Sequence, residues 1–212
     1  MTSKAELQAM RSGHEEKVRI TAPIAAELEE SALKDGMPDL GPDRNRPSLF
    51  TLSRVKENFA PSGAFAYLTW ETYVSRETED RLMRTGQTVK TRPELVLTEK
   101  QGIGVRGGED GVTNQAIPTT FVDLYDALAL RAAAHGILGL CDYEIYEKLA
   151  STYCDCMRAT CPEGMRNPTF AEVRRFDRAM HTEILKWLAR GIGTLTGAIS
   201  YYLDDRHLEM CK

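Results

Sequence analysis

The amino-acid sequence predicts a mainly α-helical protein, with a helical bundle in its C-terminal half, a small β-hairpin or extended loop near residues 88–106 and a flexible N-terminal arm. Apolar residues recur every three or four positions in four segments after residue 118, which is the period of an amphipathic helix. Residues 88–106 instead alternate apolar and polar side chains, as strands do. We therefore expect an arm and linker over residues 1–47 and a mainly helical domain over residues 48–212.

The composition is that of an ordinary globular protein with no large excess of either charge. Of its 212 residues, 42% are hydrophobic and 27% are charged, and the formal net charge is -4. No apolar run approaches the roughly 20 residues that a membrane span needs, so we expect no membrane partner. The polar start of the chain predicts no secretory signal. With five cysteines, an odd number, we expect reduced thiols and a cytoplasmic location or an assembled particle.

The first 47 residues resemble an arm more than a domain, because they contain four of the nine prolines and few large apolar side chains. One amphipathic helix is expected there, with Thr21 as its cap, Pro23 in its first turn and Gly36 at its end. Residues 35–47 read as a linker. Since such a segment cannot form a core alone, we expect the arm to dock on another molecule and to join copies of the chain into a homo-oligomer.

The domain is expected to begin with a short helix that Pro61 stops. A second helix is predicted from about Phe65, continuing toward Gly86. The alternating stretch 88–106 follows, and residues 107–118 are glycine-rich and polar, which predicts a flexible connection.

Four helices with short connections fill the C-terminal half, which makes a bundle the expected architecture. Thr119 or Thr120 caps the first and Asp142 the second, and Asn167 precedes the third. The second helix is predicted to bury Tyr146, Leu149, Tyr153 and Cys156. The third is predicted to bury Val173, Phe176, Met180, Ile184 and Trp187.

The third of these helices carries cations on the side opposite its apolar stripe. We call this set the basic arc: Arg174, Arg175, Arg178, Lys186 and Arg190, with Arg166 just before the helix. At about 100° per residue the helical members share one broad face. The arginine fork makes paired hydrogen bonds to phosphate, so the basic arc is our candidate nucleic-acid site. A purely solvated charged face is the alternative interpretation.

Asp177 lies at the border of the predicted apolar stripe. A carboxylate there loses hydration unless an arginine reaches it, so we expect a structural ion pair. The run Arg174, Arg175, Phe176, Asp177, together with the helical layout and the N-terminal arm, resembles the coat proteins of flexuous filamentous plant viruses. That resemblance implies a helical fold with RNA lying against basic side chains.

Three other motifs are given structural interpretations. Gly102 to Gly107 fits the G-x-G-x-x-G pattern, but the following Gly-Glu-Asp-Gly does not start a helix, so we expect a turn and no cofactor. Four cysteines lie between Cys141 and Cys161, and zinc binding through them and His135 stays open. The Tyr-Leu-Asp-Asp run at 202–205, with His207, is interpreted as an acidic helix end.

Three functions remain in contention. The favoured one is a non-enzymatic helical assembly protein, like a nucleocapsid or coat, that binds the backbone of single-stranded nucleic acid without sequence preference. The first alternative is a protein–protein interaction module or a subunit of a larger complex. The second is a metal-dependent enzyme, for which the sequence offers no nucleophile–base pair. Few aromatic residues interleave with the arginines, so the sequence does not predict base stacking.

Overall fold

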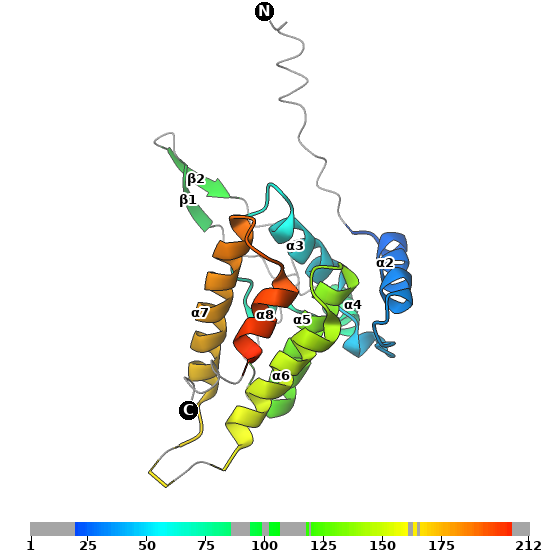
Figure 1. Ribbon diagram of the computed structural model, residues 1–212. Coiled ribbons are helices and arrows are strands. Elements are labelled where there is room, and N and C mark those ends of the chain that lie inside the picture. Colours follow the sequence, from blue (N-terminus) through cyan, green and yellow to red (C-terminus); the bar gives the residue numbers. More distant parts are fainter. Residues whose placement is uncertain are drawn as a thin grey trace, which may run out of the picture.

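The structure, a computed structural model, confirms that the protein is mainly helical (Figure 1). It describes residues 20–85, 118, 120–160, 163–164 and 166–204, and the backbone of 94–98 and 102–106. The helices are α2 (Ala22–Lys34), α3 (Leu49–Phe59), α4 (Arg76–Arg84), α5 (Phe121–Ile137), α6 (Tyr143–Arg158), α7 (Phe170–Ala189) and α8 (Leu195–Leu203). Short 3-10 turns occupy Asp43–Asn45 and Trp70–Thr72. None of the helices in these described segments is long and apolar enough to cross a membrane.

Two short strands lie within the stretch for which the sequence predicts a hairpin or an extended loop. Strand β1 (Glu94–Thr98) pairs antiparallel with β2 (Gly102–Arg106), with Leu97 opposite Ile103. Two glycines of the G-x-G-x-x-G run, Gly102 and Gly104, therefore belong to a strand and not to a turn that opens a helix.

Local capping explains where several helices begin. The side chains of Ser48, Ser75 and Thr194 each accept a hydrogen bond from a backbone N–H three residues later. Thr120 with Asp123, and Thr169 with Glu172, form complete capping boxes at α5 and α7. Each cap satisfies N–H groups that the helix itself leaves unpaired.

The predicted start of the second helix, near Phe65, is wrong. The chain from 64 to 69 is not helical, and α4 begins only at Arg76. The side chain of Asn58 explains the difference, because its amide donates to the Ala66 carbonyl and its oxygen accepts from the Ala66 N–H, both at 2.9 Å. These bonds occupy backbone groups that a helix would have used.

The four C-terminal helices contribute to one apolar core. Helix α6 contacts both α5 and α8, and α8 also contacts α7 (Figure 1). The fully buried side chains of this core include Leu124, Leu128, Tyr146, Leu149, Ile184 and Ile199. The predicted face of α6 needs one correction, because Cys156 is exposed while Cys154 and Met157 are buried. The buried face of α6 is thus displaced toward these two residues.

A second apolar cluster joins α2 to α3 and α5, so this part of the predicted flexible arm packs against the helical domain of its own chain. Ile20 and Ala25 are buried in this cluster against residues of α3 and α5 such as Val55 and Ala134. Glu29 of α2 also accepts hydrogen bonds from Arg46 and Arg76. Helix α5 buries side chains over much of its circumference, so it needs cover on a second side, and α2 supplies it. Residues 1–19 lie outside the described residues.

Candidate functional site

Helix α7 carries the predicted basic arc, and its buried face is rotated from the predicted one. The buried residues are Val173, Asp177, Met180, His181, Ile184 and Leu185. At about 100° per residue, their centre lies roughly 60° from the predicted centre, close to Asp177. Phe176 and Trp187, predicted to be buried, are only half-buried at the edge of this face. The difference arises because polar Asp177 and His181 occupy core positions.

Three arginines of the basic arc are open to solvent. Arg175, Arg178 and Arg190 are exposed. Within the described parts of the chain, no acidic side chain forms an ion pair with any of them. Figure 1 shows α7 at one side of the molecule and α2 at the other, so this outer face of α7 is not covered by α2. These three side chains form a positively charged surface.

The other three predicted cations already have acidic partners. Arg166 makes two hydrogen bonds to Glu172, at 2.8 and 2.7 Å. The Lys186 ammonium lies 2.6 Å from a Glu183 carboxylate oxygen. Arg174 pairs with Glu71 at 2.6 Å and is only partly exposed, because it lies beside the buried face of the helix. Phosphate would have to compete with a carboxylate at each of these positions.

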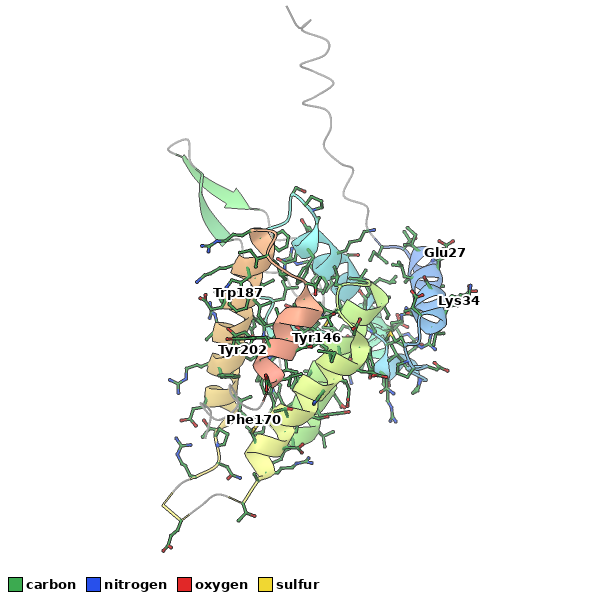
Figure 2. All side chains as sticks on the ribbon, viewed as in Figure 1. Glu27, Lys34, Tyr146, Phe170, Trp187 and Tyr202 are labelled. Carbon is green, nitrogen blue, oxygen red and sulfur yellow. The ribbon has the colours of Figure 1, made fainter. Side chains whose placement is uncertain are left out.

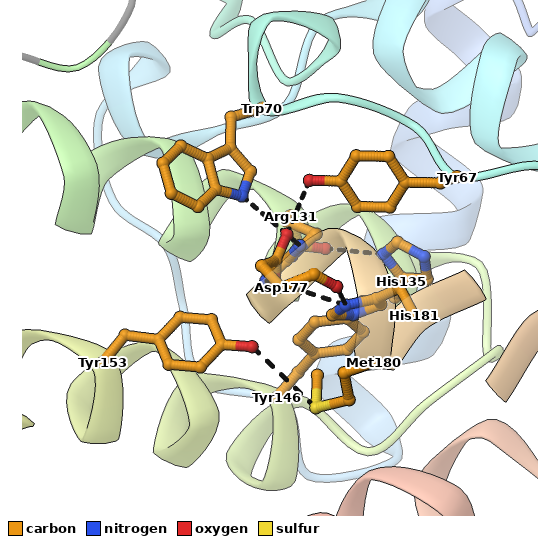
Figure 3. Close-up of polar contacts among 9 residues, drawn as sticks. All are labelled: Tyr67, Trp70, Arg131, His135, Tyr146, Tyr153, Asp177, Met180 and His181. Carbon is orange, nitrogen blue, oxygen red and sulfur yellow. Dashed lines mark hydrogen bonds and ion pairs between the residues drawn. The ribbon is translucent and has the colours of Figure 1, made fainter. Parts of the chain in front are cut away.

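On the buried side, Asp177 is the centre of a polar cluster (Figure 3). Its carboxylate accepts two hydrogen bonds from the Arg131 guanidinium, both at 2.9 Å. It also accepts from the Trp70 indole at 2.8 Å and from the Tyr67 hydroxyl at 2.7 Å. Asp177 and Arg131 are 0% and 1% exposed. The arginine that the sequence predicts for Asp177 is thus Arg131 of α5.

Two histidines extend this cluster. His181 Nδ1 lies 2.9 Å from the Asp177 carbonyl oxygen and 3.2 Å from its carboxylate. His181 Nε2 lies 2.7 Å from the Tyr146 hydroxyl. A proton on Nδ1 lets His181 donate to Asp177, while the Nε2 contact joins the ring to Tyr146 of α6. His135 stacks on Tyr146 with ring centroids 4.8 Å apart, and its Nδ1 lies 2.8 Å from the Arg131 carbonyl oxygen.

The charges of the cluster shift the pKa values of its members. Burial alone would raise the pKa of Asp177, but the Arg131 charge, with His181 and their hydrogen bonds, holds that pKa well below its usual value. Burial raises the pKa of the Tyr67 hydroxyl, and the Asp177 charge raises it further. Burial lowers the pKa of His135 to about 3. At neutral pH the cluster therefore holds an ionised Arg131–Asp177 pair beside a neutral His135.

This cluster holds helices together and leaves little room for a ligand. It joins α7 to α5 and to the segment that carries Tyr67 and Trp70. The adjoining pocket, lined partly by Arg131, His135 and His181, has a volume of about 20 Å³, enough for little more than a water molecule. The polar cluster therefore fixes the orientation of α7, and hence the direction in which the basic arc faces.

The metal-ligand candidates are not brought together in the part of the chain that the structure describes. There, no group of three or more His, Cys, Asp or Glu side chains is placed to hold a metal ion. Cys141 and Cys154 are buried and Cys156 is exposed. Cys161 and the second aspartate of the Tyr-Leu-Asp-Asp run, with His207, lie outside the described residues.

Arg131 was not among the residues predicted for the site, although the sequence carries a signal for it. Arg131 follows Leu124 by seven residues, so at about 100° per residue it lies within about 20° of that leucine on the helix surface. An arginine on the buried face of an apolar helix requires an acidic partner. Asp177, predicted to need an arginine, is its counterpart.

No protein-family model, no curated protein and no solved structure matches this chain.

Proposed function

We propose that this protein binds the phosphate backbone of single-stranded nucleic acid, in the manner of a coat or nucleocapsid protein built on a C-terminal helical bundle. The observation that carries the proposal is the exposed face of α7, where Arg175, Arg178 and Arg190 have no acidic partner among the described residues. Arginines in this state suit phosphate, because their paired donors are not already used by carboxylates.

The buried cluster supports the same proposal. Arg131 and Asp177 tie α7 to α5 through two hydrogen bonds. A surface on a helix that is held in this way stays preorganised, so binding does not have to order it first. Side-chain contacts to phosphate carry no sequence information, so we expect binding that does not depend on sequence.

The net charge of -4 opposes tight binding by a single copy. Three phosphate contacts per copy predict a salt slope of about 2 for single strands, at about 0.7 per contact. We propose that copies lie side by side on the strand, because each additional copy repeats the same three contacts. That the N-terminal arm joins the copies stays a prediction that no described contact tests.

A charge-matched pair of variants tests the proposal. In the first variant, Arg175, Arg178 and Arg190 are all replaced by Gln. In the control, the exposed cations Lys56, Arg81 and Arg84 of α3 and α4 are replaced by Gln, which changes the net charge by the same amount. Fluorescence anisotropy with labelled single-stranded RNA over 50–300 mM salt gives affinity and slope.

We expect the first variant to lose most of the affinity and to flatten the slope by about 2, while the control keeps both nearly unchanged. Equal losses in the two variants would show that only net charge matters. A wild-type protein that ignores RNA at about 50 mM salt would reject nucleic-acid binding. The first variant should then be tested for loss of an acidic protein partner, as the interaction-module alternative predicts.

A further inference from the structure

An aromatic cluster lies where α7 and α8 meet. Trp187 of α7 contacts Tyr201 and Tyr202 of α8, with ring centroids 6.2 Å apart in both pairs. The Trp187 and Tyr202 rings are nearly parallel, whereas Tyr201 meets Tyr202 edge to face at 5.6 Å. Figure 2 labels Trp187 and Tyr202 on these two helices. We call these three residues the aromatic cluster.

The aromatic cluster is not simply a part of the core. Trp187 and Tyr202 are half-buried and pack partly against the core of the C-terminal helices. Tyr201 is 51% exposed and lies outside that core. Ile192, in the turn between the two helices, is 56% exposed. Trp187 and Tyr202 are thus supported by the core, while Tyr201 and part of the surface of the other two rings meet solvent.

The aromatic cluster borders the basic arc. Trp187 lies between Lys186 and Arg190 in the sequence, and Arg190, the C-cap of α7, follows it by three residues. Arg190 is exposed with no acidic partner among the described residues. The nearby charge of Glu183 is offset by its ion pair with Lys186. An incoming anion therefore meets an available cation beside an aromatic surface.

We propose that the aromatic cluster is a stacking platform for one or two unpaired nucleobases of the strand whose phosphate contacts Arg190. This inference rests on the proposed function and specifies its ligand as single-stranded. Aromatic rings stack on bases of any sequence, and a strand without a partner exposes those base faces. A positive surface that follows the backbone beside such rings is the combination that sequence-independent single-strand binding uses.

The sequence alone does not predict this platform. In the sequence, the two tyrosines are 14 and 15 residues beyond Trp187 and carry no basic neighbours before Arg206. Only the turn at 190–194, with Gly191 and Gly193 in left-handed conformations at φ values of 72° and 71°, brings α8 back to Trp187. These conformations favour glycine over other residues.

Two ligands distinguish the contribution of base stacking to binding from the contribution of charge. Oligouridine and inorganic polyphosphate of equal charge are bound to wild-type protein and to the Tyr201→Ala and Tyr201→Phe variants. We expect Tyr201→Ala to weaken oligouridine binding by about five-fold or more and to leave polyphosphate binding and the salt slope unchanged. Tyr201→Phe, which keeps the ring, should bind as wild type. Tyr125→Ala, which removes a 38% exposed tyrosine of α5, is the control and should bind both ligands normally.

Tryptophan fluorescence of the wild-type protein gives a readout that needs no variant. The chain has two tryptophans, and Trp70 is only 2% exposed, so quenching by a stacked base reports mainly on Trp187. We expect oligouridine to quench this emission and polyphosphate not to.

Each remaining outcome overturns the inference in a recognisable way. If both ligands bind but Tyr201→Ala changes neither, the phosphate surface stands and the platform is wrong. If neither ligand binds, the proposed function fails and the platform with it. If Tyr201→Ala reduces self-association in sedimentation velocity while oligouridine affinity stays the same, the aromatic cluster is a contact between copies of the chain.

Discussion

Replacing Asp177 by Asn tests whether the buried cluster holds α7 in place. The substitution keeps the shape of the side chain but removes the charge that faces Arg131, which is 1% exposed. Arg131 would then be a buried cation without a counter-ion. Breaking a buried pair in this way costs about 3–5 kcal/mol of unfolding free energy, a large share of the 5–15 kcal/mol that typical domains possess.

Urea unfolding, followed by far-ultraviolet circular dichroism, measures this loss. The Arg131→Met variant and the double variant complete a double-mutant cycle. Because the double variant leaves neither charge unpaired, we expect it to be less destabilised than the sum of the single variants by about 1–3 kcal/mol. Arg166→Gln is the control, because it removes an exposed ion pair whose partner is Glu172 and should cost at most about 1 kcal/mol.

The pH dependence follows from the direction of the Asp177 pKa shift. Its pKa in the folded protein is depressed, so its contribution is complete above the unfolded value of about 3.9 and disappears as pH falls below it. The difference between wild type and Asp177→Asn should therefore be constant from pH 5 to 7 and should narrow below about pH 4. An Asp177→Asn protein within about 1 kcal/mol of wild type at pH 7, or additive single substitutions, would refute the reasoning.

Three further predictions concern stability. The pKa of His135 is about 3 in the folded protein and about 6.5 when unfolded, so only the unfolded chain takes up a proton in this range. The free energy of unfolding should therefore decrease by up to about 1.4 kcal/mol for each unit that the pH falls from about 6.5 to about 3. In urea unfolding, His135→Gln should lack this contribution to the pH dependence. Trp70→Ala should lower the free energy of unfolding by about 3–5 kcal/mol, but Trp187→Ala by only about 1–2 kcal/mol, because the Trp187 indole is half-buried. Equal melting temperatures of the two variants would contradict this prediction. Deleting residues 1–47 should lower the free energy of unfolding by more than about 3 kcal/mol relative to a chain lacking residues 1–19, because buried Ile20 and the apolar face of α2 are lost. Coincident urea unfolding curves would show that α2 adds nothing.

Much of the helical content was accessible from the sequence because helix signals are local. The caps at Thr120 and Thr169, and the three-to-four-residue apolar period, involve neighbours in the chain. The same local reasoning failed at Phe65, where Asn58 holds the backbone of Ala66 in a non-helical form. That contact spans eight residues and overrides the periodicity of the segment.

For the candidate site, the sequence determined that α7 is amphipathic, that one of its faces is basic and that Asp177 needs an arginine. Only the tertiary structure decided that this arginine is Arg131, 46 residues away, and that the buried face centres on Asp177. It also decided which arginines have carboxylate partners and that two tyrosines lie beside Trp187. The physical reason is that the period of a helix depends on neighbours in the chain. Desolvation, ion pairing and ring contacts depend on which distant segments pack together.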